Sequence, residues 1–137
     1  MKSYEELEVW QRSVALAVGL YKATKPFPSE EKFGLTSQIR RPATSIPANV
    51  AEGWGRGSTK EYIQFLLVAR GSLMELETHS IISETLGYLT PPQLSDIRTE
   101  TRQIGKMLNG LIQALRARQP AGRRSLIPDP QPLTPSP

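Results

Sequence analysis

Apolar residues recur every three or four positions through most of this chain, which is the spacing of helices that bury one face. The repeat falls into four segments before residue 119, and proline or glycine separates each segment from the next. Strict alternation of apolar and polar residues, which would indicate strands, is not the dominant pattern. The sequence therefore predicts an all-α fold.

The first two predicted helices meet at a proline-containing turn. Ser3 and Glu6 have the spacing of a capping box, so we expect the first helix to begin there and to end near Thr24, before Pro26. The second is expected to begin after Ser29. Its predicted buried residues are Phe33, Leu35, Ile39, Ala43, Ile46 and Val50, and the glycines that end it are Gly53, Gly55 and Gly57.

The third predicted helix opens with a second capping box, Ser58 to Glu61, and ends near Gly87. Its seven-residue repeat comprises Tyr62, Leu66, Ala69, Leu73, Leu76, Ser80 and Ser83. A further apolar set lies beside that repeat, namely Ile63, Leu67, Met74 and Ile81. Such a helix contacts several neighbours, either at the centre of a bundle or in an oligomer.

The fourth predicted helix follows a turn at residues 90–92. Its apolar positions alternate three- and four-residue spacings through Leu94, Ile97, Thr101, Ile104, Leu108, Leu111 and Leu115. With short loops between the four segments, we expect an antiparallel four-helix bundle over residues 1–118. Because Pro42 and Pro47 fall inside the second segment, we also expect that helix to be kinked or locally broken.

Residues 119–137 have a different composition, with six of the twelve prolines of the chain. Such a segment cannot hold a helix, and we expect a polyproline-like or flexible tail. It could serve as a docking peptide, but a solvated appendage is the favoured interpretation.

Composition excludes several kinds of chemistry. The chain has no cysteine and a single histidine, so it has no disulfide and no site made of several histidines. No apolar run is long enough to span a membrane, and the acidic, aromatic N-terminus does not resemble a secretion signal, so we expect a cytoplasmic protein. A net charge of +4 suits an anionic partner.

The second predicted helix carries an unusual polar stripe. Arg41, Ser45, Asn49 and Glu52 recur every three or four residues beside the apolar face. In the favoured, structural interpretation, Ser45 and Asn49 satisfy carbonyls left unpaired around Pro47. Arg40 or Arg41 then pairs with an acidic residue, for which the candidates are Glu52, Glu75 and Glu77. In the functional interpretation, Arg40, Arg41 and Arg56 face solvent and neutralise phosphates.

The glycine-rich segment 53–57 allows two interpretations. Its amides, together with Arg56 and Lys60, could hold a phosphate at the start of the third helix. The spacing does not match a nucleotide-binding loop, so helix termination is favoured.

Catalysis has little support in the sequence. His79 lies beside the apolar repeat of the third helix without a cysteine or serine in a familiar arrangement, and a surface or interface histidine is favoured. The Glu-x-x-His spacing of carboxylate-bridged metal bundles is absent. We therefore expect a protein that is not an enzyme and has no metal or other cofactor.

The C-terminal part of the chain is basic. Its candidate phosphate contacts are Arg98, Arg102, Lys106, Arg116, Arg118, Arg123 and Arg124. Cations near the end of a helix are also favourable for the helix itself, so this observation alone leaves a solvated helix face equally possible.

The segment from Ser37 to Arg56, SQIRRPATSIPANVAEGWGR, resembles the signature of four-helix-bundle proteins encoded within intervening sequences of bacterial 23S ribosomal RNA genes. The resemblance covers about residues 4 to 115. It includes LEVWQ at 7–11, FGLT at 33–36, GSLMELET at 71–78 and LGYL at 86–89. Pro42 departs from it, since the pattern usually has a small helix-compatible residue there.

The resemblance implies a function class. The same fold is shared by the accessory variability proteins of diversity-generating retroelements, which form barrel-shaped homopentamers, bind nucleic acid and work with a reverse transcriptase. For this chain the resemblance implies a ring-shaped homo-oligomer, a pentamer, with an RNA or DNA partner and a reverse transcriptase as a further partner. It also implies that Ser45, Pro47, Asn49, Glu52, Gly53 and Glu75 belong to the structural signature. The expected function is a non-enzymatic nucleic-acid-binding accessory of a ribonucleoprotein, and the alternative is a structural or protein-interaction scaffold.

Overall fold

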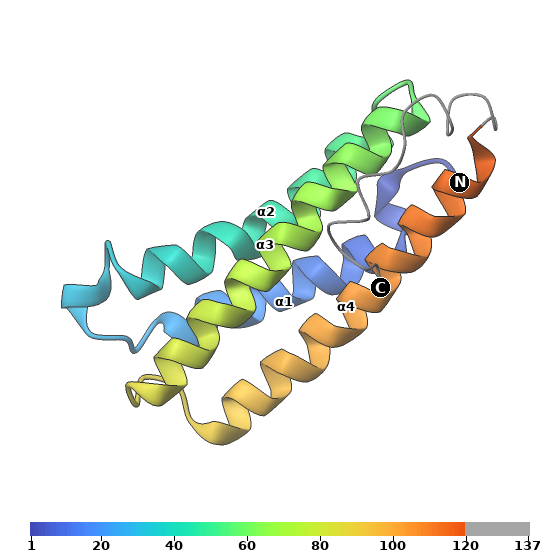
Figure 1. The fold of residues 1–137 in the computed structure, drawn as a ribbon. Coiled ribbons are helices and arrows are strands. Elements are labelled where there is room, and N and C mark those ends of the chain that lie inside the picture. The colour runs from blue at the N-terminus through green and yellow to red at the C-terminus, as the bar shows by residue number, and fades with distance from the viewer. Residues whose placement is uncertain (120–137) are drawn as a thin grey trace, which may run out of the picture.

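The computed structural model describes residues 1–119, and these residues form helices without any strand. The four α-helices are α1 (Glu8–Thr24), α2 (Leu35–Trp54), α3 (Thr59–Thr85) and α4 (Pro91–Arg118). Two short 3-10 helices, η1 (Tyr4–Glu6) and η2 (Ser29–Glu31), precede α1 and α2. Figure 1 shows the order of these elements. The prediction of an all-α fold is confirmed, whereas the predicted tail lies almost entirely outside the described residues.

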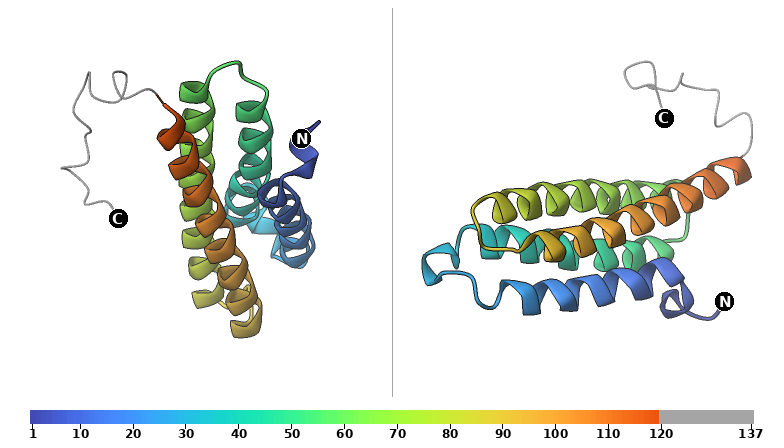
Figure 2. Two further views of the ribbon diagram at one scale, coloured as in Figure 1. Left: turned by 90° about the vertical axis from the view of Figure 1, so that its right-hand side faces the viewer. Right: turned by 90° about the horizontal axis from the view of Figure 1, so that it is seen from below.

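The helices pack side by side in an elongated bundle (Figure 2). α2 packs on α1 and α3, α4 packs on α3, and a smaller contact joins α4 to α1. Buried apolar side chains from all four helices form one continuous core. Its most buried large residues include Leu20, Ile39, Ile46, Leu66, Leu76, Ile104 and Leu108. Burial of this apolar surface is the main source of stability for such a bundle.

The N-terminal capping box predicted for the first helix is wrong. The Ser3 hydroxyl accepts a hydrogen bond from the amide of Glu5, and this caps the 3-10 helix η1. The Glu6 carboxylate accepts from the amide of Lys2, and α1 begins only at Glu8. The predicted end of α1 at Thr24 is confirmed.

The start of α2 also differs from the prediction. Phe33 was expected to be buried, but it is 88% exposed because it lies in the turn before the helix. The last residue of η2 caps α2 instead, since Glu31 Oε1 accepts from the amide of Leu35 at 2.9 Å. The other five predicted core residues of this segment are buried.

α2 runs from Leu35 to Trp54 as one helix that includes both prolines. Pro42 and Pro47 are buried and supply no backbone N–H, yet neither interrupts the helix. The expected local break is therefore wrong, and the kink stays a prediction.

Gly53 marks a close approach of α2 to α3. A Cβ atom at this position would lie 2.8 Å from Phe65 Cβ and 3.0 Å from Tyr62 Cδ1. The first contact is shorter than side-chain packing tolerates and the second is tight, so a larger residue here would have to push the two helices apart.

The predicted repeat of α3 is confirmed, because six of its seven residues are buried and Tyr62 is half-buried. The neighbouring set is less uniform: Ile63 is buried, Leu67 and Ile81 are half-buried, and Met74 is 60% exposed. Gly87 ends the helical region with a φ of 86°, which an L-residue rarely adopts.

The turn between α3 and α4 is fixed by side chains. Thr90 and Gln93 form a capping box at the start of α4, which the sequence interpretation missed. The Tyr88 hydroxyl donates to Glu31 Oε2 at 3.1 Å, and this hydrogen bond raises the pKa of Tyr88.

No helix within residues 1–119 combines the length and apolarity needed to cross a lipid bilayer.

Candidate nucleic-acid interface

The polar stripe of α2 links this helix to α3. Ser45 Oγ and Ser72 Oγ lie 2.9 Å apart, and Asn49 Nδ2 donates to both the carbonyl and the hydroxyl of Ser45, at 2.8 and 2.9 Å. The structural role expected for Ser45 and Asn49 is wrong in one detail, namely which carbonyl is satisfied. Pro42 and Pro47 have no N–H, so the carbonyls that lose their backbone donor are those of Gln38 and Ala43, four residues earlier. Asn49 donates instead to the carbonyl of Ser45.

Arg40 joins α2 to the last turn of α1. Its Nε donates to Thr24 Oγ1 at 2.9 Å, its Nη2 donates to the Tyr21 carbonyl at 3.1 Å, and its guanidinium lies 4.5 Å from the centre of the Tyr21 ring. A cation is favourable at this carbonyl-rich end of a helix. The predicted pairing of Arg40 with an acidic residue of α2 or α3 is therefore wrong, because its Nε and Nη2 donate to groups of α1 instead.

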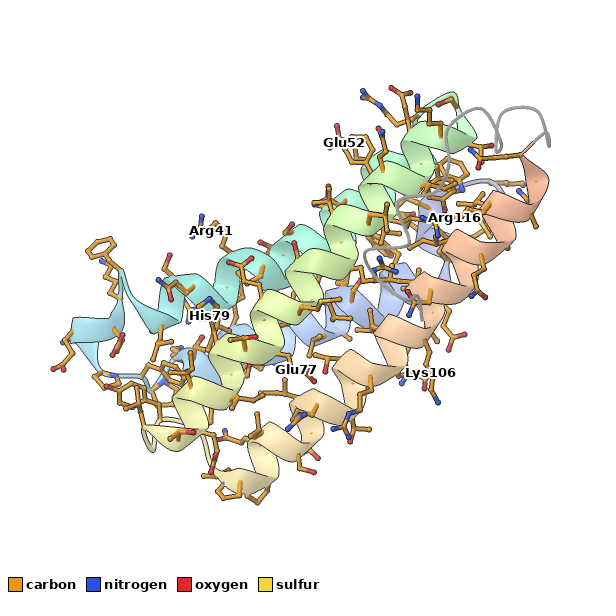
Figure 3. The ribbon with its side chains drawn as sticks, viewed as in Figure 1. Arg41, Glu52, Glu77, His79, Lys106 and Arg116 are labelled. Atoms are coloured by element: carbon orange, nitrogen blue, oxygen red, sulfur yellow. The ribbon has the colours of Figure 1, made fainter. Side chains whose placement is uncertain are left out.

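Arg41 behaves differently from its neighbour. It is exposed and makes no ion pair or hydrogen bond through its side chain with any residue in the range 1–119, so its predicted pairing with Glu52, Glu75 or Glu77 is also wrong. In Figure 3 it projects from α2 away from the other helices. Arg41 therefore remains available to an anionic partner.

The segment 53–57 ends one helix and leads to the next. The Gly55 amide donates to the carbonyls of Ala51 and Glu52, and the Ser58 hydroxyl accepts from the amide of Glu61. Arg56 lies 3.8 Å from Glu52 and 3.9 Å from Glu61, and its guanidinium covers the Phe65 ring. Lys60 is exposed. The contacts of Arg56 account for it structurally, as helix termination does for the glycines.

Two glutamates of α3 have different partners, and Glu77 is the one that contacts α4. Glu77 Oε2 accepts from Thr101 Oγ1 at 3.0 Å and lies 3.5 Å from Arg98 Nε (Figure 3 labels Glu77). Glu75 lies 4.0 Å from His79 Nε2, while His79 Nδ1 is buried without a hydrogen-bond partner. Across the described residues, no group of three or more His, Cys, Asp or Glu side chains is arranged to hold a metal ion.

The basic row of α4 consists of Arg98, Arg102 and Lys106, which are four residues apart and therefore share one side of the helix. Arg98 is held by Glu77, whereas Arg102 and Lys106 are exposed and make no ion pair or hydrogen bond with residues 1–119. Figure 3 shows Lys106 on the outer side of α4. These two unpaired cations lie one turn apart on a regular helix.

The other C-terminal candidates extend this charge. Arg116 and Arg118 are exposed in the last turn of α4. Burial raises the pKa of Tyr62, and the positive charge of Arg118 opposes that rise, which places Arg118 close to the start of α3. Arg123 and Arg124 lie outside the described residues.

Two features had no recognisable motif in the sequence. Arg12 makes a two-pronged contact with Glu100 across α1 and α4, at 2.9 and 3.2 Å. α3 and the residue that follows it also expose several large apolar side chains, namely Val68, Met74, Ile82 and Leu86. Only the second apolar set of α3 indicated such a surface in advance.

The comparisons with known proteins agree with this helical arrangement. The family model of the 23S rRNA-intervening sequence protein matches residues 5–110. A crystal structure of a protein of unknown function from the S23 ribosomal protein family of Bacteroides thetaiotaomicron has 28% sequence identity and a TM-score of 0.70. The similarity covers 77% of this chain and 98% of that one. None of the curated proteins matches. Because the family model spans most of the bundle, this chain belongs to the 23S rRNA-intervening sequence protein family.

Proposed function

We propose that this protein is a non-enzymatic, homo-oligomeric nucleic-acid-binding protein that acts as an accessory of a ribonucleoprotein. The observation that carries the proposal is the basic row of α4, in which Arg102 and Lys106 are exposed and have no acidic partner within residues 1–119. Arg12 and Arg56, in contrast, lie beside carboxylates.

The row has the chemistry of phosphate contacts without base recognition. Its cations are spaced by one helical turn on a rigid element, and the side chains are long enough to follow a nucleic-acid backbone. Arg41 and Lys60, which are exposed on α2 and α3, add further positive charge. Binding should therefore depend steeply on salt and weakly on sequence.

The oligomeric part of the proposal is supported by two different apolar surfaces. One comprises the exposed side chains Val68, Met74 and Ile82 of α3, and the other is a groove of about 490 Å³ between α1 and α4. Two unlike surfaces suit a head-to-tail contact, which forms a ring when the rotation between neighbouring copies closes. We propose a pentamer of antiparallel bundles by analogy with the retroelement accessory proteins, with a reverse transcriptase as a further partner. Native mass measurement tests the ring, and the genomic neighbourhood tests the partner.

Salt-dependent RNA binding tests the main proposal. We expect the double variant Arg102→Gln, Lys106→Gln to bind an RNA oligomer at least tenfold more weakly at low salt, with a shallower dependence of log K on log salt. The matched control is Lys22→Gln, Lys25→Gln, which removes the same charge from exposed positions at the end of α1. Fluorescence anisotropy over a salt series measures both.

Two results would contradict the proposal. Equal weakening by the two double variants would mean that only net charge matters, and comparable affinity at low and high salt would exclude phosphate contacts as the source of binding.

The second candidate is a structural or protein-interaction scaffold with no nucleic-acid role. It is favoured by the polar contacts of the α2 residues Arg40, Ser45 and Asn49, which connect α2 to its neighbours or bond within it. The Nε–H of Arg40 already donates to Thr24 and is therefore not available to a ligand. An oligomer without RNA affinity would support this candidate over the first.

A further inference from the structure

A second depression lies between the last turns of α3 and the first turns of α4. It has a volume of about 350 Å³, and its lining includes Arg98 and Arg102 from α4 and Glu84 from α3. This volume is near the lower end of the range for small-ligand pockets, about 300 to 1,000 Å³. The depression is therefore large enough for more than a bare anion.

The α4 side of the pocket carries two arginines and two hydroxyl groups. Glu77 lies 3.5 Å from the buried Arg98 Nε, which makes no hydrogen bond within residues 1–119, and Glu77 is itself bonded to Thr101. An ion pair thus holds one end of the guanidinium, while the terminal Nη groups make no ion pair or hydrogen bond within residues 1–119. Arg102 adds a second cation, and the Ser95 and Thr99 hydroxyls lie along the same lining. Two guanidinium groups and hydroxyl donors match the acceptor oxygens of a phosphate.

Glu84 gives the pocket a different requirement. It is half-buried and has no hydrogen bond or ion pair through its side chain with the described residues. An ionised carboxylate only accepts hydrogen bonds, so a ligand whose phosphate lies nearby binds more tightly if it also presents a donor to Glu84. A ribose 2′-hydroxyl is such a donor, and the corresponding position of DNA has none.

The remaining wall is apolar. Pro91 and Leu94 line the pocket beside the polar groups and can contact a sugar or a base face without selecting among bases. The lining thus contains a phosphate side, an acceptor and an apolar surface around one small volume.

We propose that this pocket binds one ribonucleotide unit of an RNA strand, with the phosphate at Arg98 and Arg102 and the 2′-hydroxyl donating to Glu84. This inference rests on the proposed nucleic-acid binding and adds that the partner is RNA rather than DNA. Glu84 is the residue that distinguishes them.

The test compares oligouridine with oligodeoxyuridine of the same length, since these differ only at the 2′ position. We expect the full-length protein to bind the RNA about three- to tenfold more tightly, as expected for a partly exposed hydrogen bond to a charged acceptor. Glu84→Ala should abolish this preference by weakening RNA binding and strengthening DNA binding. The control Glu5→Ala removes one exposed carboxylate from η1, outside both this pocket and the groove between α1 and α4, and it should keep the preference.

The outcomes separate this inference from the proposed function. If both oligomers bind but Glu84→Ala leaves their affinity ratio unchanged, the pocket assignment is wrong while nucleic-acid binding stands. If neither oligomer binds, the proposed function fails together with the pocket. A preference for DNA in the unaltered protein would also overturn the inference.

Discussion

α2 and α4 both carry arginines at helical spacing, but they use them differently. On α2, Arg40 donates hydrogen bonds from Nε and Nη2 to Thr24 and Tyr21 of the neighbouring helix. On α4, Arg102 projects into solvent without an acidic partner in the described residues. The family signature lies on α2, so the segment that resembles a family most strongly is the one whose polar groups are largely used for packing.

The role of a polar stripe on a helix therefore depends on which residues of the adjacent helices face it. Ser45 and Asn49 face α3, where Ser72 completes their hydrogen bonds. The row on α4 has only Glu77 opposite its first member. Substitutions on α2 should therefore change stability first, whereas those on α4 should change binding first.

The largest stability effect is expected where α2 and α3 approach closely, at Gly53. Gly53→Ala should lower the free energy of unfolding by about 1 to 3 kcal/mol, because the new methyl group would overlap Phe65 Cβ and the Tyr62 ring. Urea denaturation at a fixed protein concentration measures this change.

Gly110→Ala on α4 is the matched control. No atom lies within 4 Å of a Cβ built at this position, so the substitution should stabilise the helix by about 0.5 to 1 kcal/mol. If Gly53→Ala were equally stabilising, the close approach of α2 and α3 would not constrain the fold.

A smaller difference should separate the two adjacent arginines. Arg40→Ala removes two hydrogen bonds and a ring contact from a half-buried site, and we expect it to cost about 1 to 2 kcal/mol. Arg41→Ala should change stability by less than about 0.5 kcal/mol, because Arg41 is exposed and unpaired in the described chain. Thermal melting of the two variants side by side provides the comparison, and equal losses would show that the inter-helix contacts of Arg40 add nothing.

The smallest effect is expected at Glu52. Its only ion pair within residues 1–119 is a 3.8 Å contact with Arg56 between two exposed side chains, so Glu52→Ala should shift the free energy of unfolding by less than about 0.5 kcal/mol. A loss above 1 kcal/mol in the same melting experiment would restore the organising role that the sequence suggested for Glu52.

The sequence predicted the helices well where local patterns determine them. The repeat of α3 from Leu66 to Ser83 is buried as expected, and Gly87 ends the helical region in a left-handed conformation. The start of α1 was missed because the Ser3–Glu6 spacing also suits a 3-10 turn. Phe33 was misassigned because the periodicity of α2 was extended through a turn that Glu31 caps from outside the helix.

The candidate site was less predictable, since its character depends on which residues meet across helices. Arg40 and Arg41 are indistinguishable by residue type, and only the position of α1 gives one of them partners. Likewise, nothing near Arg98 in the sequence indicates Glu77, which lies 21 positions earlier and meets it only when α3 packs on α4.

The contacts of Tyr4 have a consequence for spectroscopy. Its ring lies 5.3 Å from that of Trp10 and 6.4 Å from that of Trp54, and these are the only two tryptophans of the chain. Tryptophan fluorescence, excited selectively at the red edge of the absorption band, therefore originates from the corner where η1, α1 and the end of α2 meet. Emission should report the loosening of that corner during denaturation, but an RNA strand bound along the middle of α4 should leave it nearly unchanged, so binding there calls for a label on the nucleic acid.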